Sequence, residues 1–313
     1  MRYLPVFLAA FCALPGAAAH AQTAATPAPV QITPHAFTDS LAVGKGSFLF
    51  ADKKGTGKTL TVHYFRPEGV NLATAPILFV MHGTLRNGAE YRDMWVEQAI
   101  RQKFLLLVPE FSAKDFPSGL YNRGNVRGRD DEKPEPEDKW TFSVLERIFD
   151  DVLKRTGSKN TGYYLYGHSA GGQFVHRFML LTAQNRCLRA VAANAGYYTL
   201  PTRTGNPPYP FSLAGVPPIM DDRQKAVFRR ELIVLLGEAD TDSKDPDLYH
   251  SPEADAQGMY RFARGKYFFA SAQKEATRLG VLLAWKLQTV PGVGHSNEKM
   301  APAAAEALFT SFR

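Results

Sequence analysis

The chain contains very little cysteine: Cys12 and Cys187 are the two among 313 residues. Cys12 lies in an N-terminal stretch that we expect to be removed, so Cys187 has no partner within the mature chain. The fold therefore cannot depend on an internal disulfide. No cluster of cysteine and histidine has zinc-binding spacing, and no H-E-x-x-H sequence occurs. We accordingly expect no metal and no organic cofactor.

The chain also lacks a long apolar run beyond its first residues. Residues 1–21 combine an early Arg2, a short apolar stretch and an Ala-His-Ala cleavage site, which is the pattern of a secretory signal peptide. Cleavage after Ala21 would leave no membrane anchor in the mature protein. We expect residues 22–59 to be a flexible lead-in and N-terminal segment, and residues 60–313 to be one catalytic domain. The mature protein is then expected to be secreted or periplasmic.

Acidic residues are in deficit, with 30 Asp and Glu against 37 Lys and Arg, for a net charge of +7. A basic secreted protein favours anionic polymers or anionic cell surfaces. A solvated basic face with no specific partner is the simpler interpretation. No nucleic-acid recognition motif accompanies the charge, so we expect no nucleic-acid partner.

Apolar strand-like runs alternate along the chain with amphipathic helical segments. Residues 60–66 alternate like an antiparallel entry strand, and residues 77–81 form a continuous apolar run typical of a strand covered on both faces. Further strands are expected at 104–109, 162–166, 189–194, 232–236 and 282–290, and helices at 90–102, 142–155, 172–181, 268–279 and from about Pro302. This alternation predicts an α/β fold with a doubly wound, mostly parallel sheet and helices on both faces.

Two polar, proline-containing insertions interrupt this alternation, at residues 112–139 and 199–225. Irregular insertions of this length are often lids or binding loops. We expect them to shape the substrate pocket, although the charged part of the first insertion is expected to be a solvated excursion.

Ser169 lies at the centre of Gly167-His168-Ser169-Ala170-Gly171, between the strand at 162–166 and the helix at 172–181. A strand, a sharp turn and a helix form the setting in which G-x-S-x-G presents a nucleophilic serine. The flanking glycines allow the neighbouring strand and helix to approach the turn closely. Ser169 is therefore the predicted nucleophile.

A serine hydroxyl needs a base, which is usually a histidine oriented by a carboxylate. His295 follows the last predicted strand and Asp240 follows the strand at 232–236, which gives the chain order serine, acid, histidine. Both lie where parallel strands end, as catalytic groups do in such sheets. Asp242 stays open as the alternative acid and His250 as the alternative base.

The tetrahedral intermediate needs two N–H donors. Ala170, directly after the serine, is expected to supply one. The loop that opens with His82-Gly83 is expected to supply the other, from Thr84 or, as the next choice, Leu85. His168 is expected to point away from the serine.

Three further residues are candidates for substrate binding. Arg86 could bind a substrate carboxylate at the pocket rim, or form an ion pair with Glu90 one helical turn on. Tyr197 and Tyr198 follow the strand at 189–194 and could line the pocket, or pack beneath a lid.

Together, His82-Gly83, the serine motif, the loop at Asp240 and Gly294-His295-Ser296 resemble the α/β-hydrolase superfamily over the region from residue 60 to the C-terminus. The pattern is similar to secreted bacterial esterases related to polyhydroxybutyrate depolymerases and feruloyl esterases. This resemblance implies a serine hydrolase that cleaves carboxylic esters through an acyl-enzyme. Polymer depolymerases of that group often carry a separate binding domain and paired cysteines. Their absence favours small or oligomeric esters over a solid polymer.

Two other functions stay open. The first is an amide-cleaving enzyme on the same fold, either a peptidase or a hydrolase of an anionic polyamide such as poly-aspartate, which the basic charge and Arg86 favour. The second is a binding protein on an inactive hydrolase scaffold, which the complete set of Ser169, Asp240 and His295 disfavours. The oligomeric state does not follow from the sequence.

Overall fold

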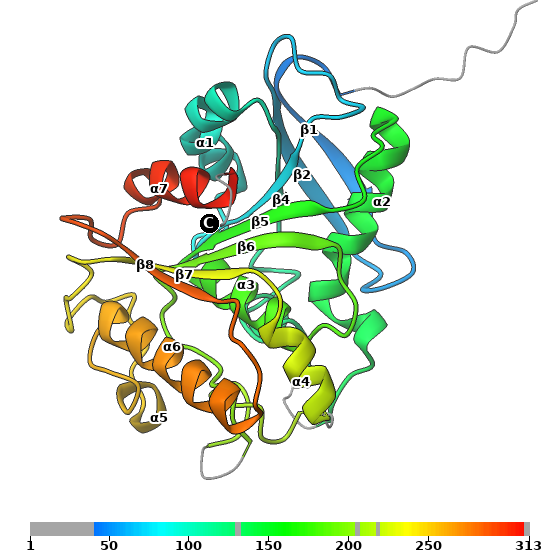
Figure 1. Ribbon diagram of the computed structural model, residues 1–313. Helices are drawn as coiled ribbons and strands as arrows, with labels where there is room; N and C mark the ends of the chain where they lie inside the picture. The colour runs from blue at the N-terminus through cyan, green and yellow to red at the C-terminus, as the bar shows by residue number, and fades with distance from the viewer. Residues whose placement is uncertain (1–40, 129–132, 204–206, 217–219, 310–313) are drawn as a thin grey trace, which may run out of the picture. The chain divides into compact units, whose positions relative to one another are not determined.

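The computed structural model describes residues 41–128, 133–203, 207–216 and 220–309. Its centre is an eight-stranded sheet with the order β1-β2-β4-β3-β5-β6-β7-β8 (Figure 1). β2 pairs antiparallel with β1 and β4, and every other neighbouring pair is parallel. The predicted doubly wound, mostly parallel sheet is therefore confirmed. The strands are β1 Gly44–Ala51, β2 Thr59–Arg66, β3 Ile77–Met81, β4 Leu105–Glu110, β5 Tyr163–His168, β6 Cys187–Ala193, β7 Leu232–Gly237 and β8 Lys286–Val290.

Helices cover both faces of the sheet, as the alternation predicts. α1 and α7 pack together over one face, and α2, α3, α4 and α6 pack over the other (Figure 1). Each face has its own apolar core, because the central strands are buried on both sides; every residue of β3 is buried. The helices are α1 Gly88–Gln102, α2 Val144–Thr156, α3 Ala170–Leu181, α4 Asp221–Phe228, α5 Pro252–Asp255, α6 Arg261–Arg278 and α7 Asn297–Phe309, with 3-10 turns η1 Glu137–Lys139 and η2 Thr141–Ser143.

The first strand of the sheet was not predicted. β1 lies within residues 22–59, which we expected to precede the catalytic domain, and it pairs with β2 along its whole length. Its side chains alternate between exposed ones, such as Leu49 at 68%, and ones that are half-buried or, at Phe50, buried. β1 is an edge strand with two glycines, so it lacks the apolar run that marks the central strands.

Other differences concern the ends of elements. The helix expected at 268–279 begins earlier, at Arg261. Its first turns bury two charged residues, Arg261 and Arg264, where an apolar stripe would otherwise mark the helix in the sequence. The strand expected at 282–290 is shorter, as β8 begins only at Lys286. No helix among the described residues is long and apolar enough to cross a bilayer. The predicted signal peptide lies outside the described residues, as do residues 129–132, 204–206 and 217–219 of the two insertions.

Candidate active site

Ser169 lies in a sharp turn between β5 and α3, with φ 58° and ψ −118°. A non-glycine residue rarely adopts this backbone conformation, and where it does the strain is often linked to function. The Ser169 N–H donates a hydrogen bond of 3.0 Å to the carbonyl of Ala193 at the end of β6. A Cβ atom on Gly167 would collide with the backbone of Gly171, and one on Gly171 would collide with the backbone of Met81. The turn therefore requires both glycines of the motif.

The structure brings the predicted base and acid together. His295 Nδ1 donates a hydrogen bond of 2.8 Å to Asp240 Oδ2. The Asp240 side chain is 3% exposed and that of His295 22%. The buried carboxylate fixes the orientation of the imidazole and leaves Nε2 for proton transfer.

The alternative acid and base have other partners. Asp242 is exposed and accepts a hydrogen bond from the backbone of Lys244. His250 binds Asp255 through Nδ1 at 2.7 Å and the carbonyl of Ser243 through Nε2 at 3.1 Å. These contacts hold a surface loop together, so Asp240 and His295 are the better candidates.

His168 occupies a position that sequence reasoning missed. Its ring centroid lies 4.5 Å from that of His295, which brings His295 beside the residue that precedes the serine. The expectation that His168 points away from Ser169 stays a prediction. His168 Nδ1 lies 3.3 Å from the hydroxyl of Tyr91. Burial, together with the charges of His295 and Arg261, holds the pKa of His168 well below its usual value, so the ring is neutral.

The predicted oxyanion loop runs past Ser169. A Cβ atom built on Gly83 would lie 3.8 Å from the Cβ of Ser169. Ala170 is the first residue of α3, where backbone N–H groups have no partner within the helix. Thr84 and Leu85 are both exposed, Leu85 by 79%. That this loop supplies an oxyanion donor, from Thr84 or Leu85, stays a prediction.

His82 holds this loop in place. Its Nδ1 donates a hydrogen bond to the carbonyl of Gly83, and its Nε2 accepts one from the Phe111 N–H, each at 3.0 Å. The Tyr121 hydroxyl donates to the His82 carbonyl at 2.7 Å. Burial lowers the pKa of His82 to about 3, so it stays neutral and structural.

Arg86 follows this loop and does not form the expected ion pair with Glu90. Its guanidinium stacks 4.1 Å from the ring centroid of Tyr121, and Nη1 donates to the carbonyl of Phe111 at 3.1 Å. Glu90 instead accepts a hydrogen bond from Asn87. Among the ion pairs of the described residues, Arg86 takes part in none. A role for Arg86 in binding a substrate carboxylate stays a prediction.

The two candidate tyrosines differ in their surroundings. Tyr198 is fully buried and stacks on Phe268 at 4.6 Å, so its ring is part of the core. Tyr197 is 4% exposed and packs against Phe211 at 5.2 Å and Tyr249 at 5.4 Å. Tyr197 belongs to an aromatic cluster with Phe211 of the second insertion and Tyr249 of a later loop, and a role for either tyrosine in binding stays a prediction.

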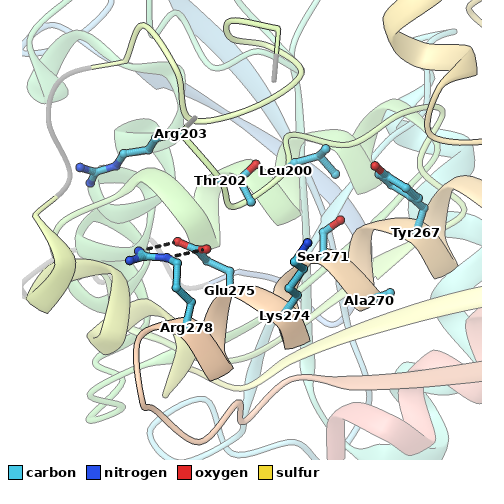
Figure 2. Close-up of a pocket in the computed structure, with 9 residues that line it drawn as sticks. All are labelled: Leu200, Thr202, Arg203, Tyr267, Ala270, Ser271, Lys274, Glu275 and Arg278. Atoms are coloured by element: carbon cyan, nitrogen blue, oxygen red, sulfur yellow. Dashed lines mark hydrogen bonds and ion pairs between the residues drawn. The ribbon is translucent and has the colours of Figure 1, made fainter. Parts of the chain in front are cut away.

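A separate cavity of about 720 Å³ lies along α6 (Figure 2). Figure 2 shows Glu275 and Arg278 joined by an ion pair of 2.8 Å at one end, with Tyr267 at the other. Ser169, Asp240 and His295 do not line this cavity. It is therefore distinct from the candidate active site. No cluster of three or more potential metal ligands occurs among the described residues.

No protein-family model matches this chain, and no curated protein matches it either. Solved structures do. Poly(aspartic acid) hydrolase-1 from Sphingomonas sp. KT-1 is 44% identical, with a TM-score of 0.82, over 86% of this chain and 100% of that one. LpqC, a poly(3-hydroxybutyrate) depolymerase from Bordetella parapertussis, is 33% identical, with a TM-score of 0.80, over 86% of this chain and 90% of that one.

The chain is an α/β-hydrolase. Identity at this level over nearly whole chains shows the family, and it relates this α/β-hydrolase to depolymerases. A more distant structure, S-formylglutathione hydrolase FrmB from Staphylococcus aureus, is 13% identical with a TM-score of 0.54 and shows the fold alone. The resemblance stated from the sequence motifs is therefore confirmed at the level of the superfamily.

Proposed function

We propose that this α/β-hydrolase is a serine hydrolase that works through an acyl-enzyme. The observation that carries the proposal is the 2.8 Å hydrogen bond between His295 and the buried Asp240, with His295 packed 4.5 Å from the ring of His168, the residue before a serine held at φ 58°. Ser169 Oγ attacks the carbonyl carbon of the scissile bond as His295 Nε2 takes its proton. Backbone N–H groups of Ala170 and Thr84 hold the oxyanion that forms.

The second half of the reaction uses the same groups. His295 returns the proton to the departing alcohol or amine, which leaves the acyl group on Ser169. Water then attacks the acyl-enzyme, with His295 as its base, and the acid is released. Asp240 keeps the imidazole in one tautomer and stabilises its charged form throughout.

For the substrate, we propose an anionic polyamide of the poly(aspartic acid) type, which the sequence left as the alternative to an ester. Three observations support this choice. The relative of 44% identity is described as a poly(aspartic acid) hydrolase. Arg86, at the end of the oxyanion loop, has no carboxylate partner among the described residues. The whole chain carries a net charge of +7, which attracts polyanions.

A carboxylic ester is the second candidate, because the relative of 33% identity is described as a poly(3-hydroxybutyrate) depolymerase. Ester and amide cleavage use the same nucleophile, base and oxyanion donors, so the catalytic residues alone do not choose between them.

Hydrolysis of poly(aspartic acid) and of a p-nitrophenyl ester series, from acetate upward, tests both choices in wild type and Ser169→Ala. New amines and shorter chains from poly(aspartic acid), abolished in Ser169→Ala, would support the polyamide. Turnover of esters alone would put the ester first. No turnover of either by folded wild type would overturn the proposed function.

We also propose that the protein is exported with removal of residues 1–21, since these residues carry the signal-peptide pattern. Expression of the full chain in a bacterial host with an export pathway should give a mature protein beginning at Gln22. An N-terminal sequence that still starts at Met1 would contradict export.

A further inference from the structure

Arg261 is buried against the acid of the proposed triad. Its Nη1 lies 3.4 Å from Asp240 Oδ1 and 2.5 Å from Asp245 Oδ2. The side chain of Arg261 is 1% exposed and that of Asp245 22%. The other oxygen of Asp240 binds His295. Four charged or chargeable groups therefore form a row: His295, Asp240, Arg261 and Asp245.

The backbone fixes the position of this arginine. Arg261 is the first residue of α6, and the N–H of the next residue, Phe262, donates to the backbone carbonyl of Asp240 at 3.1 Å. The start of α6 is thereby attached to the loop that carries the acid. A guanidinium held this way is a fixed partner of Asp240, unlike a surface arginine that changes rotamer freely.

We propose that Arg261 and Asp245 position Asp240 and set the charge that it presents to His295. Arg261 offsets part of the negative charge of Asp240, and Asp245 in turn offsets part of the positive charge of Arg261. Both are positioning residues, since they act on the reaction through Asp240. The inference rests on the proposed function, in which His295 must be neutral to act as base.

The other groups around this row do not substitute for the pair. His168 packs on His295 and is neutral for the reasons given above. Burial raises the pKa of Tyr198, which faces Asp240, so it is neutral as well. Arg264 lies one turn along α6 from Arg261, but its charge is paired with Asp255 at 2.7 Å. Burial alone would raise the pKa of Asp245, whereas hydrogen bonds from Arg261 and from the backbone N–H of Asp247, with the charges of Arg261 and His295, bring it below its usual value.

The two members of the pair should therefore act in opposite directions. Removing the positive charge of Arg261 stabilises protonated His295, so activity should be lost at higher pH than in wild type. Removing the negative charge of Asp245 destabilises protonated His295, so activity should persist to lower pH. If Arg261 and Asp245 were needed only for folding, their two variants would not shift the pH dependence of activity in opposite directions.

The test is the rate of inactivation by phenylmethanesulfonyl fluoride as a function of pH. Ser169 Oγ forms a bond to sulfur as fluoride leaves and His295 takes the proton. The fall of the inactivation rate at low pH, which is the acid limb of the profile, therefore reports the protonation of His295 whatever the natural substrate. We expect the midpoint of the acid limb to move up by about 0.5–1 pH unit in Arg261→Gln and down by about 0.5 pH unit in Asp245→Asn.

Matched controls come from the neighbouring pair on the same helix. Arg264→Gln removes an equally buried arginine, and Asp255→Asn removes its partly exposed partner, without touching Asp240. Both should leave the acid limb within about 0.2 pH unit of wild type. If Arg261→Gln does not fold, Asp245→Asn decides the question, because its side chain is partly exposed.

The inference would be overturned if the midpoint of the acid limb stayed in place or moved to higher pH in Asp245→Asn. It would also be overturned if the control variants shifted that midpoint as much as Arg261→Gln and Asp245→Asn do. A failure of the proposed function looks different: wild type would then not react with the sulfonyl fluoride at Ser169 at any pH.

Discussion

Asn194 Nδ2 donates a hydrogen bond of 3.2 Å to the carbonyl of Gly294, the residue before His295. Its Oδ1 accepts one of 2.8 Å from the N–H of Gly237, at the end of the strand that leads to Asp240. Asn194 directly follows β6, has φ 44° and is 1% exposed. One buried side chain thus ties together the loops that carry the proposed acid and base.

Replacing Asn194 with glycine should loosen both loops without backbone strain, since glycine accepts a positive φ. We expect a loss of about 1–3 kcal/mol in the free energy of unfolding. We also expect kcat to fall about 10- to 100-fold, because a small displacement of the base disturbs proton transfer. Urea unfolding and steady-state kinetics measure the two effects.

Asn185→Ala is the control, because it also removes two hydrogen bonds but lies at the other end of β6. It should lower stability and leave kcat within about twofold of wild type. Equal kcat in Asn194→Gly and wild type would contradict this role.

The two glycines of the serine motif should be intolerant of alanine. A Cβ atom at Gly167 or Gly171 would meet backbone atoms, which cannot rotate away as a side chain could. Each substitution is expected to destabilise the fold by about 2–4 kcal/mol, as overpacked sites do. Gly119 offers the control, because its Cβ would meet no atom within 4 Å. Thermal unfolding compares the three variants, and a Gly171→Ala protein as stable as Gly119→Ala would show that the turn is not built as described.

Arg86→Gln should weaken binding of an anionic substrate. Removing one charge-assisted contact raises KM for poly(aspartic acid) about 10-fold. Turnover of uncharged p-nitrophenyl acetate should not change. Arg101→Gln removes a positive charge at an exposed position on α1, where Arg101 pairs with Glu97. If both variants raise KM equally, general attraction between charges explains binding; if Arg86→Gln also slows the ester, Arg86 instead supports the oxyanion loop.

The turn after β1 should make stability depend on pH. Burial alone would raise the pKa of Asp52, but hydrogen bonds from Arg147 and Thr56 and the charge of Arg147 bring it below its usual value. A carboxylate whose pKa is depressed by folding adds stability above its unfolded pKa and loses it as the pH falls through its folded pKa. Asp52→Asn should therefore be less stable by about 3 kcal/mol at pH 7, where Arg147 is left without its partner.

Urea unfolding at pH 7 and at about pH 3 checks this expectation. The difference between Asp52→Asn and wild type should shrink as the pH falls below about 4, since the Asp52 carboxylate of the unfolded chain is protonated first and that of the folded protein only at lower pH. A difference that stays constant from pH 7 to pH 3 would show that the pair does not titrate with folding. Asp115→Asn serves as control, because its ion pair with Lys58 is long, at 3.8 Å, and partly exposed.

The central sheet and the catalytic candidates follow from local sequence signals. β3 is a continuous apolar run, and Ser169, Asp240 and His295 each follow a predicted strand. Parallel strands bring their carboxyl ends to one edge of the sheet, so the sequence alone predicts that these three residues lie near one another.

The features that the sequence did not reveal depend on contacts between distant residues. β1 is held by pairing with β2 and by the hydrogen bond that Arg147, 95 positions along the chain, donates to Asp52. His168 meets His295 only because the loop after β8 folds back across the sheet edge. Arg261 begins a helix with a buried charge, a position where an apolar pattern would be expected. Local propensity carries no information about such pairs.

Labelling with an aryl fluorophosphonate, followed by mass spectrometry of the intact and digested protein, tests the nucleophile and its base most directly. One adduct on the peptide that contains Ser169 is expected in wild type and none in Ser169→Ala. His295→Ala should react about a thousandfold or more slowly, since the hydroxyl then has no base. Labelling that persists in Ser169→Ala, or that proceeds in His295→Ala at the wild-type rate, would contradict the account.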